Sequence, residues 1–307
     1  MYLKKLNVSS YLRNVVSIFY KRNFKGWGRK KTGRFASWCY EKFGGKLTLF
    51  EDGFIRSLAL GVDGSPSFSV VEDDVGIYYD ATTPSRLENV LNSYDFKSDA
   101  ELTQDAKKAI SLITQNNISK YNDSKDLPSD FFQAQEERVL VIAQTAGDAS
   151  LKYGMLENFT TDDMIDAAIT ENPNAKVYLK IHPDVLSGKK KSDVDVESAK
   201  KRCVIIEENV NPLSLLKRFS KVYTKTSQMG FEALLVGCEC VCFGMPFYAG
   251  WGITIDKSVC HRRKRKLSVE EVFAAAYVIY SEYHNPYTRK DTDIFDTIET
   301  IIKMRNL

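Results

Sequence analysis

Acidic side chains are missing from the first forty residues of this 307-residue chain, which hold ten Lys and Arg side chains. The whole chain is nearly neutral, with 43 basic against 40 acidic side chains. A basic N-terminal segment therefore precedes a mildly acidic body, which suits an anionic partner. Beyond Phe24 and Trp27 this segment shows no motif in which base-stacking side chains are interleaved with the basic ones, so we expect no nucleic-acid partner.

Long apolar runs are also absent. No stretch of about 18 apolar residues exists that could form a membrane-spanning helix. The N-terminus is basic on both sides of its apolar residues and lacks a small-residue cleavage site, so it is a poor secretory signal. A hydrophobic fraction of 43% excludes a disordered chain, and the length suggests two domains.

Several catalytic signatures are missing as well. The chain has no Walker loop, no Gly-x-Ser-x-Gly elbow and no Gly-x-Gly-x-x-Gly fingerprint, which argues against P-loop NTPases, serine hydrolases and the commoner dehydrogenases. Two Asp-x-Asp pairs, at 193–195 and 291–293, do not follow clear buried strands. We therefore expect no metal and no other cofactor.

The cysteines alternate where they cluster, at Cys238, Cys240 and Cys242. Alternation places the three on one face of a strand. Cys-x2-Cys pairs of the zinc-binding kind are absent, so we expect buried, reduced thiols and a cytoplasmic protein.

Short apolar runs alternate with amphipathic segments, which predicts an α/β fold with a mostly parallel sheet after residue 138. A polar stretch at 120–130 suggests a domain boundary near residue 136. The predicted strands are Leu47–Phe50, Gly76–Tyr79, Val139–Ala143, Lys176–Ile181, Val204–Ile206, Lys221–Thr224 and Cys240–Phe243. The predicted helices are Ser85–Leu91, Leu102–Ile113, Asp162–Thr170, Pro212–Phe219, Gln228–Val236 and Ser268–Tyr280.

Two segments of the N-terminal half stand out. In "GWGRKKTGR" (26–34), two glycines flank Trp27 and a basic loop follows. This pattern fits either a solvated turn or a close backbone approach to an anion. In "EDGFIR" (51–56), acidic residues follow a strand, where they either face solvent or border a ligand site.

Three segments of the C-terminal half also combine strand ends with reactive side chains. Asp148 follows a strand in "QTAGD" and is either a nucleophile or base, or a helix N-cap. Lys180 and His182 share a face by period-two spacing and could grip a phosphate. Thr226 and Ser227 precede a helix whose N-terminus favours anions, while the later "PFYAGWG" (246–252) is either a ligand-covering loop or a packed corner.

Taken together, these motifs resemble the KpsC-type bacterial β-Kdo transferases of capsule assembly. The matching stretches, between residues 26 and 290, are "EDGFIRSLALG", "GIYYDATTPSRLE", "ISKYN", "QTAGD", "KIHPDVLSGKK", "ENVNPLSLL", "TSQMGFEALLVG", "CFGMPFYAGWG" and "FAAAYVIYSEYHNP". The typical capsule-initiating enzyme carries two such modules, whereas this chain has one. The resemblance implies a GT-B-like fold of two Rossmann-like lobes with a central cleft. We expect residues 1–136 to form the acceptor lobe and 137–307 the donor lobe, with the last helix free to pack back on the first.

The resemblance further implies that the enzyme transfers Kdo from CMP-β-Kdo to a sugar hydroxyl with retention, and that Asp148, Glu51 and His182 are catalytic. Asp148 would be the nucleophile and Glu51 the base that activates the acceptor. The expected donor-binding residues are Lys180, Gln144, Gly147, Asn209, Asn211, Thr226, Ser227 and Glu232. The expected acceptor-binding residues are Arg29, Lys30 and Arg56.

The expected acceptor is a lipid-linked or polymeric Kdo-containing glycan. Two other functions stay open: an inverting, sialyltransferase-like CMP-sugar transferase with Asp148 as general base, and an inactive CMP-sugar-binding module that recruits other enzymes. Residues 1–25 place Leu12, Val15, Val16 and Phe19 on one helical face beside basic residues. This face suits either peripheral contact with the inner membrane or packing on the first lobe.

Overall fold

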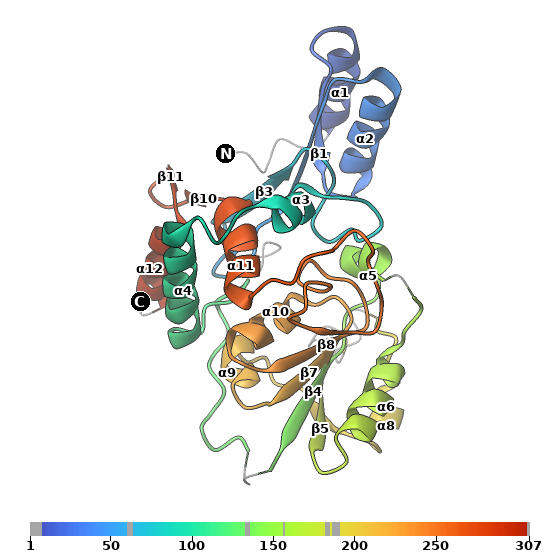
Figure 1. Ribbon diagram of the computed structural model, residues 1–307, viewed down its shortest axis with the longest axis vertical. Helices are drawn as coiled ribbons and strands as arrows, with labels where there is room; N and C mark the ends of the chain where they lie inside the picture. The colour runs from blue at the N-terminus through green and yellow to red at the C-terminus, as the bar shows by residue number, and fades with distance from the viewer. Residues whose placement is uncertain are drawn as a thin grey trace.

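The computed structural model describes residues 8–59, 64–132, 136–155, 157–181, 185 and 191–305. These residues form two β-sheets with helices around them, stacked along the long axis of the molecule (Figure 1). The predicted α/β fold with two lobes is therefore confirmed. No helix in this part of the chain is long and apolar enough to cross a bilayer.

The first sheet has five strands in the order β1-β2-β3-β10-β11. β1 and β2 are parallel, and the other three neighbouring pairs are antiparallel. Helix α2 joins β1 to β2 as the crossover that parallel strands need, so the Rossmann-like part of this lobe is its β1–α2–β2 unit. The strands are β1 (Asn23–Trp27), β2 (Lys46–Asp52), β3 (Ser69–Asp73), β10 (Ser281–Asn285) and β11 (Lys290–Thr292).

The second sheet has six parallel strands in the order β6-β5-β4-β7-β8-β9, as the β-α-β pattern predicts. Its central strands are buried on both faces, with Val139, Leu140 and Val141 fully inaccessible. The strands are β4 (Arg138–Ile142), β5 (Lys176–Lys180), β6 (Val204–Ile206), β7 (Lys221–Thr224), β8 (Glu239–Cys242) and β9 (Ile255–Asp256).

Helices cover both sheets. Those of the first lobe are α1 (Val8–Phe19), α2 (Lys31–Phe43), α3 (Arg86–Ser93), α4 (Ala100–Gln115), α11 (Val269–Phe273), the π-helix η2 (Ala274–Ile279) and α12 (Ile294–Arg305). Those of the second are α5 (Ala149–Gly154), α6 (Thr161–Glu171), α8 (Val196–Ala199), α9 (Pro212–Leu216) and α10 (Gln228–Leu235). The predicted capping box at Ser268 and Glu271 begins α11.

The C-terminal segment returns to the first lobe. α12, the last helix, packs on β10 and α4 of this lobe. β10 also pairs with β3 and lengthens the first sheet. We did not foresee these strands, because residues 281–292 are polar and lack a β-branched run.

The predicted strand at Gly76–Tyr79 is wrong, since these residues form a turn after β3. The Asp73 carboxylate accepts hydrogen bonds from the backbone N–H groups of Val75, Gly76 and Arg86, which bends the chain away from the sheet. Tyr78 and Tyr79 consequently lie between the lobes.

The largest hydrophobic core crosses from one lobe to the other. Phe231 of α10 lies 5.2 Å from Phe247 and 5.8 Å from Tyr277, measured between ring centroids. Residues 246–249 and Trp251 are buried in this core, so the "PFYAGWG" segment is a packed corner. The two lobes therefore share an apolar interior.

The cysteines are free thiols, as predicted. Cys240 and Cys242 share one face of β8, with their Sγ atoms 3.8 Å apart. Cys238 precedes the strand and points to the carbonyl oxygens of Leu216 and Phe219, so the predicted shared face holds for two of the three.

Candidate active site

Most of the predicted site residues follow the carboxyl ends of parallel strands, where α/β sheets bind ligands. In the first lobe Trp27 ends β1 and Glu51 lies one residue before the end of β2. In the second, Gln144 follows β4 and Thr226 follows β7. Two strand ends from each sheet thus supply the candidate site.

Glu51 is buried and held by donors. Trp27 Nε1 lies 2.8 Å from Glu51 Oε1, and the backbone N–H of Asp52 lies 3.2 Å from the same oxygen. Burial raises the pKa of the Glu51 carboxyl, and the positive charge of Lys30 partly opposes the rise. A carboxyl with a raised pKa beside directed donors suits general base catalysis near neutral pH.

Gly28 makes this arrangement possible. Its φ is +35°, and a Cβ at this position would come within 2.6 Å of Glu51 Oε2 and 2.3 Å of the Tyr79 hydroxyl. A side chain here would displace both groups, so the second glycine of "GWG" is required by the close approach of three segments.

Arg29 lies beside Glu51 and is used within the protein. Its backbone N–H donates to the Tyr79 hydroxyl at 2.8 Å, and its guanidinium bonds Asp80 at 2.6 Å and Thr83 at 2.8 Å. Arg29 thereby fixes the turn that carries Tyr79. Burial, together with the negative charge of Glu51, raises the pKa of Tyr79 and keeps its phenol protonated.

The other two predicted acceptor residues differ in their availability. Lys30 is exposed, with Nζ 5.4 Å from the centre of the Trp27 ring. Arg56 pairs with Asp52 at 3.0 Å and donates to the Ser57 hydroxyl at 2.8 Å. Of the three predicted acceptor residues, Lys30 is therefore the one with an exposed side chain.

Asp148 is exposed and begins helix α5 as its N-cap. Its Oδ1 accepts hydrogen bonds from the backbone N–H of Ser150 at 2.9 Å and from the Ser150 hydroxyl at 3.0 Å. Among the described residues, the hydrogen bonds of this exposed carboxylate fall on Oδ1 and none falls on Oδ2. Gly147, with φ +86° and open space where a Cβ would stand, leaves room beside it.

Gln144 and Thr226 connect this turn to β7. The backbone N–H of Thr226 donates to Gln144 Oε1 at 2.8 Å, and Gln144 Nε2 donates to Thr226 Oγ1 at 3.1 Å. Thr226 Oγ1 lies 2.9 Å from the Ser150 hydroxyl, which completes a chain of polar contacts to Asp148. The predicted donor residues Gln144, Gly147 and Thr226 are thus gathered around Asp148.

The turn that carries Tyr78 and Tyr79 links the lobe of Glu51 to the lobe of Asp148. The backbone N–H of Ala81 donates to the Tyr153 carbonyl at 2.9 Å, which joins the tyrosine turn to α5. Burial and the negative charges of Glu51, Asp52 and Asp148 together raise the pKa of Tyr78. Glu51 and Asp148 therefore lie within electrostatic reach of one phenol at the junction of the lobes.

The predicted phosphate-binding residues are partly described. Lys180 Nζ donates to the Glu208 carbonyl at 2.6 Å, and burial lowers the pKa of this ammonium to about 8. Ser227 caps helix α10 by accepting from the backbone N–H of Met229. His182 lies outside the described residues, so its expected partnership with Lys180 stays a prediction.

Three residues that were predicted to bind the sugar-nucleotide donor lie apart from the Asp148 cluster. Asn209 is exposed, and Asn211 is buried as the N-cap of α9, with its Nδ2 bonding the Asn117 carbonyl at 2.7 Å. Glu232 is buried and accepts from the Ser119 hydroxyl at 2.7 Å, and burial raises its pKa to about 6. Within the described part of the chain, no hydrogen bond joins these three to the Asp148 cluster.

An ion pair between a buried lysine and an exposed aspartate lies next to Thr226 in the chain. Lys225, 3% exposed, pairs with Asp193, whose carboxylate accepts from both the backbone N–H and the hydroxyl of Thr161. Burial would raise the pKa of Asp193, but these donors lower it. The first Asp-x-Asp pair is thus engaged internally, and no group of three His, Cys, Asp or Glu side chains suited to a metal occurs among the described residues.

Sequence reasoning missed four contributors, namely Trp27 as a donor, Tyr79, Ser150 and Lys225. Tyr79 belongs to "GIYYDATTPSRLE", one of the stretches that match the family, but the sequence predicted it to lie in a strand. Ser150, two residues after Asp148, has the spacing of a capping partner and could have been recognised from that signal. Lys225 gave no signal, because its partner Asp193 is 32 residues away.

The chain is similar to known proteins over most of its length. Residues 25–284 match the family described as "Capsule polysaccharide biosynthesis protein". The capsule polysaccharide modification protein LipA of Neisseria meningitidis serogroup B is 41% identical over 92% of this chain. The match covers 41% of LipA, so the chain spans less than half the length of that relative.

Two solved structures are similar over most of the chain. The Thermosulfurimonas dismutans KpsC β-Kdo 2,4-transferase is 44% identical with a TM-score of 0.84, covering 91% of this chain and 86% of that one. The KpsC β-Kdo 2,7-transferase of the same organism is 27% identical with a TM-score of 0.72, covering 96% and 89%. The arrangement of the two lobes is therefore that of these proteins.

Proposed function

Because the chain belongs to the capsule polysaccharide biosynthesis protein family, we propose that it is a retaining glycosyltransferase that moves Kdo from CMP-β-Kdo to a sugar hydroxyl. The acceptor is a Kdo-containing capsule or lipopolysaccharide glycan, lipid-linked or polymeric. The 44% identity to a KpsC β-Kdo 2,4-transferase supports this substrate class.

The observation that carries the proposal is the position of two carboxylates in different lobes, each near the carboxyl end of a parallel strand. Glu51 lies one residue before the end of β2 in the first sheet and Asp148 follows β4 of the second, and the Ala81 N–H bonds the Tyr153 carbonyl to join the tyrosine turn to α5. Retention through two inversions requires a nucleophile on one face of the sugar and an acid/base group on the other. Two carboxylates on opposite sides of the lobe junction meet that requirement.

Asp148 is the nucleophile in this mechanism. Its Oδ2, which accepts no hydrogen bond among the described residues, attacks the anomeric carbon of Kdo, and the bond from that carbon to the phosphate oxygen breaks, so CMP leaves with the bonding electrons. Ser150 donates twice to Oδ1 and orients the carboxylate for the attack. The product of this step is an ester between Kdo and Asp148.

Glu51 acts in the second step. The acceptor hydroxyl attacks the anomeric carbon, its proton passes to Glu51, and the Asp148 carboxylate is released. The buried site raises the pKa of Glu51, which makes it a better proton acceptor than a solvated carboxylate. Lys30, with Arg29 and Arg56 behind it, meets the anionic acceptor.

The leaving phosphate is received by the second lobe. Lys180 supplies positive charge, and Ser227 stands at the N-terminus of α10, where backbone N–H groups favour an anion. His182 completes this set in the proposal, while Asn209, Asn211 and Glu232 bind the nucleotide. A single phosphate carries little charge, so protein cations and amides suffice without a metal, and chelation with EDTA should leave transfer intact.

Trapping the adduct tests the proposal. The Glu51→Gln variant retains Asp148 but lacks the base, so with CMP-Kdo it should accumulate a Kdo ester on the Asp148 peptide, detected by mass spectrometry. The control is Glu51→Gln/Asp148→Asn, which should show no adduct. A folded, donor-binding Glu51→Gln protein without the ester would overturn the nucleophile assignment.

Two further outcomes identify the alternatives. NMR of the product reports its anomeric configuration: an inverted product would make Asp148 a general base, as in a sialyltransferase-like enzyme. Binding of CMP without turnover on any glycan of a Kdo-acceptor panel would indicate a recruitment module.

A further inference from the structure

Helix α1 is attached to the protein by its polar side. Ser10 and Asn14 are 3% and 2% exposed, whereas Leu12, Val16 and Phe19 are 64%, 58% and 86% exposed. This is the reverse of an ordinary surface helix, which buries its apolar stripe. Of the two interpretations of that stripe, packing on the first lobe is therefore wrong.

The edge of the first sheet explains the reversal. β1 is an edge strand, and its outer backbone groups need partners. Asn14 accepts from the Lys25 N–H and donates to the Lys25 carbonyl, both at 2.9 Å, while the Ser17 hydroxyl does the same for Asn23 at 2.8 and 3.0 Å. These four bonds fix the rotation of α1 and force its apolar side outward.

The outward side is a continuous apolar face, which we call the α1 face. Its members are Tyr11, Leu12, Val15, Val16, Phe19 and Tyr20 on α1 and its end, with Trp38 on α2. Tyr11 is joined to Trp38 through Phe35, at centroid separations of 5.2 and 5.9 Å. Exposed apolar patches of this kind mark interaction sites.

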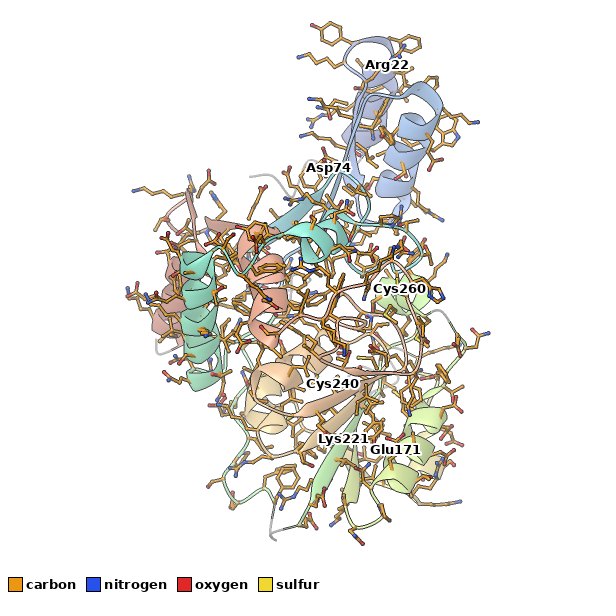
Figure 2. All side chains as sticks on the ribbon, in the orientation of Figure 1. Arg22, Asp74, Glu171, Lys221, Cys240 and Cys260 are labelled. Atoms are coloured by element: carbon orange, nitrogen blue, oxygen red, sulfur yellow. The ribbon has the colours of Figure 1, made fainter. Side chains whose placement is uncertain are left out.

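The surroundings of the α1 face are strongly basic. Residues 8–46 contain ten Lys and Arg side chains and a single acidic one, Glu41. Arg13, Lys21 and Arg22 are exposed next to the apolar side chains. Helices α1 and α2 project from the body, and Arg22 lies at the far end of the projection (Figures 1 and 2). A second copy of this nearly neutral chain would offer fewer anionic groups than a sheet of acidic headgroups does.

We propose that the α1 face docks on an anionic lipid bilayer, with its aliphatic and aromatic side chains among the acyl chains and its basic side chains against the headgroups. Amphipathic helices bind membranes in this manner, with both apolar burial and headgroup attraction contributing. β1 runs from this projection to Trp27, a span of about 13 Å. If the proposed function holds, the face brings Glu51 close to acceptors that are anchored in the same bilayer.

Vesicle cosedimentation of the full chain tests this inference. We expect binding to mixed phosphatidylcholine–phosphatidylserine vesicles, weaker binding to phosphatidylcholine alone, and a loss of affinity as salt rises. Val16→Asp/Phe19→Asp should reduce the partition coefficient at least tenfold. The matched control is Val259→Asp, since Val259 is also exposed, at 69%, but lies away from the face.

A second pair addresses charge. Arg13→Glu/Lys21→Glu should weaken binding to the anionic vesicles only, while Lys97→Glu/Lys107→Glu, which reverses two exposed lysines elsewhere, should leave it unchanged. Circular dichroism and the urea midpoint check that each variant is folded. Transfer to a soluble acceptor should be the same in all of them.

Equal vesicle binding by the wild type and Val16→Asp/Phe19→Asp would overturn the inference. So would concentration-dependent self-association in sedimentation velocity that the same variant abolishes, because the face would then join two copies of the chain. A wild-type protein that binds the vesicles but transfers no Kdo would contradict the proposed function and would not contradict the docking of the α1 face.

Discussion

Trp27 Nε1 and Glu51 Oε1 are 2.8 Å apart, so an indole from one parallel strand fixes a carboxylate on the next. The bond stabilises the ionised carboxylate in a buried place that otherwise opposes ionisation. The position of the proposed base and its pKa therefore depend on a residue that does not touch the reacting atoms.

Replacing this donor should shift the pH dependence of transfer. In Trp27→Phe the carboxylate loses a hydrogen bond, its pKa rises further, and the acidic limb of the kcat profile moves to higher pH, with kcat at neutral pH falling about tenfold. A loss of activity that is equal at every pH would indicate a structural role alone. Trp38→Phe, at an exposed tryptophan of α2, is the control and should leave soluble-acceptor kinetics unchanged.

Asp148 has two duties that substitution can separate. Asn is as good an N-cap as Asp, so Asp148→Asn should unfold at nearly the wild-type urea concentration yet lose transfer by a factor of about 10³ or more. Asp148→Ala loses both duties and should also be destabilised by about 1 kcal/mol. Appreciable transfer by the folded Asn variant would show that the carboxylate is dispensable.

Lys180 predicts a pH dependence of donor binding. Its pKa of about 8 lies below the ordinary 10.5, so the positive charge is lost as pH rises through 8. We expect CMP affinity, measured by calorimetry, to fall between pH 7 and 9, and Lys180→Gln to weaken binding at pH 7 and flatten this profile. Lys201→Gln, at an exposed lysine, serves as the comparison. An unchanged profile in Lys180→Gln would remove Lys180 from the phosphate site.

Glu232 makes stability depend on pH. Its folded-state pKa of about 6 exceeds the ordinary 4.5, so the folded state binds the proton more tightly. This contribution to stability is fully present below pH 4.5 and is lost as pH rises through 6, a change of about 2 kcal/mol. We would measure the free energy of unfolding in urea at pH 4.5 and at pH 7. The loss of about 2 kcal/mol between these pH values that Glu232 causes in the wild type should be absent from Glu232→Gln. It should persist in Glu207→Gln, a change at an exposed glutamate. Equal pH dependence in wild type and Glu232→Gln would contradict the raised pKa.

Asn211 separates a structural from a nucleotide-binding role. Its Oδ1 caps α9 and its Nδ2 joins the segment after α4, so Asn211→Ala should lose about 1 to 2 kcal/mol of stability. If it also binds the nucleotide, as proposed, calorimetry on the folded variant should show weakened CMP binding. Unchanged CMP affinity would confine it to the structural role.

The periodic parts of the fold could be predicted from the sequence. The buried strands of the second sheet read as short apolar runs, and Ser85, Asp148, Ser227 and Ser268 marked helix starts that the structure bears out. What the sequence concealed were contacts between distant segments. The pairing of β10 with β3 joins residues about 210 positions apart, and no local pattern reports it.

The same limit applies to the candidate site. Residues at strand ends were found because each follows an apolar run, and the structure gathers Gln144, Gly147, Thr226 and Asp148 accordingly. Asn211 and Glu232 were also predicted to bind the donor, yet their polar atoms bond Asn117 and Ser119 of the first lobe. Which polar side chain meets a ligand and which crosslinks the protein depends on where the other lobe lies, and that is a tertiary property.

The strand order of the first sheet constrains how the chain reaches its native state. One edge of β3 pairs only with β10, so during synthesis this edge stays unpaired until residue 285 has left the ribosome. The last strand of the six-stranded sheet, β9, ends earlier, at residue 256. We therefore expect the lobe with the six-stranded sheet to fold before the lobe with the five-stranded sheet. Shortened chains that stop before Ser281 should expose the unpaired edge of β3 and aggregate.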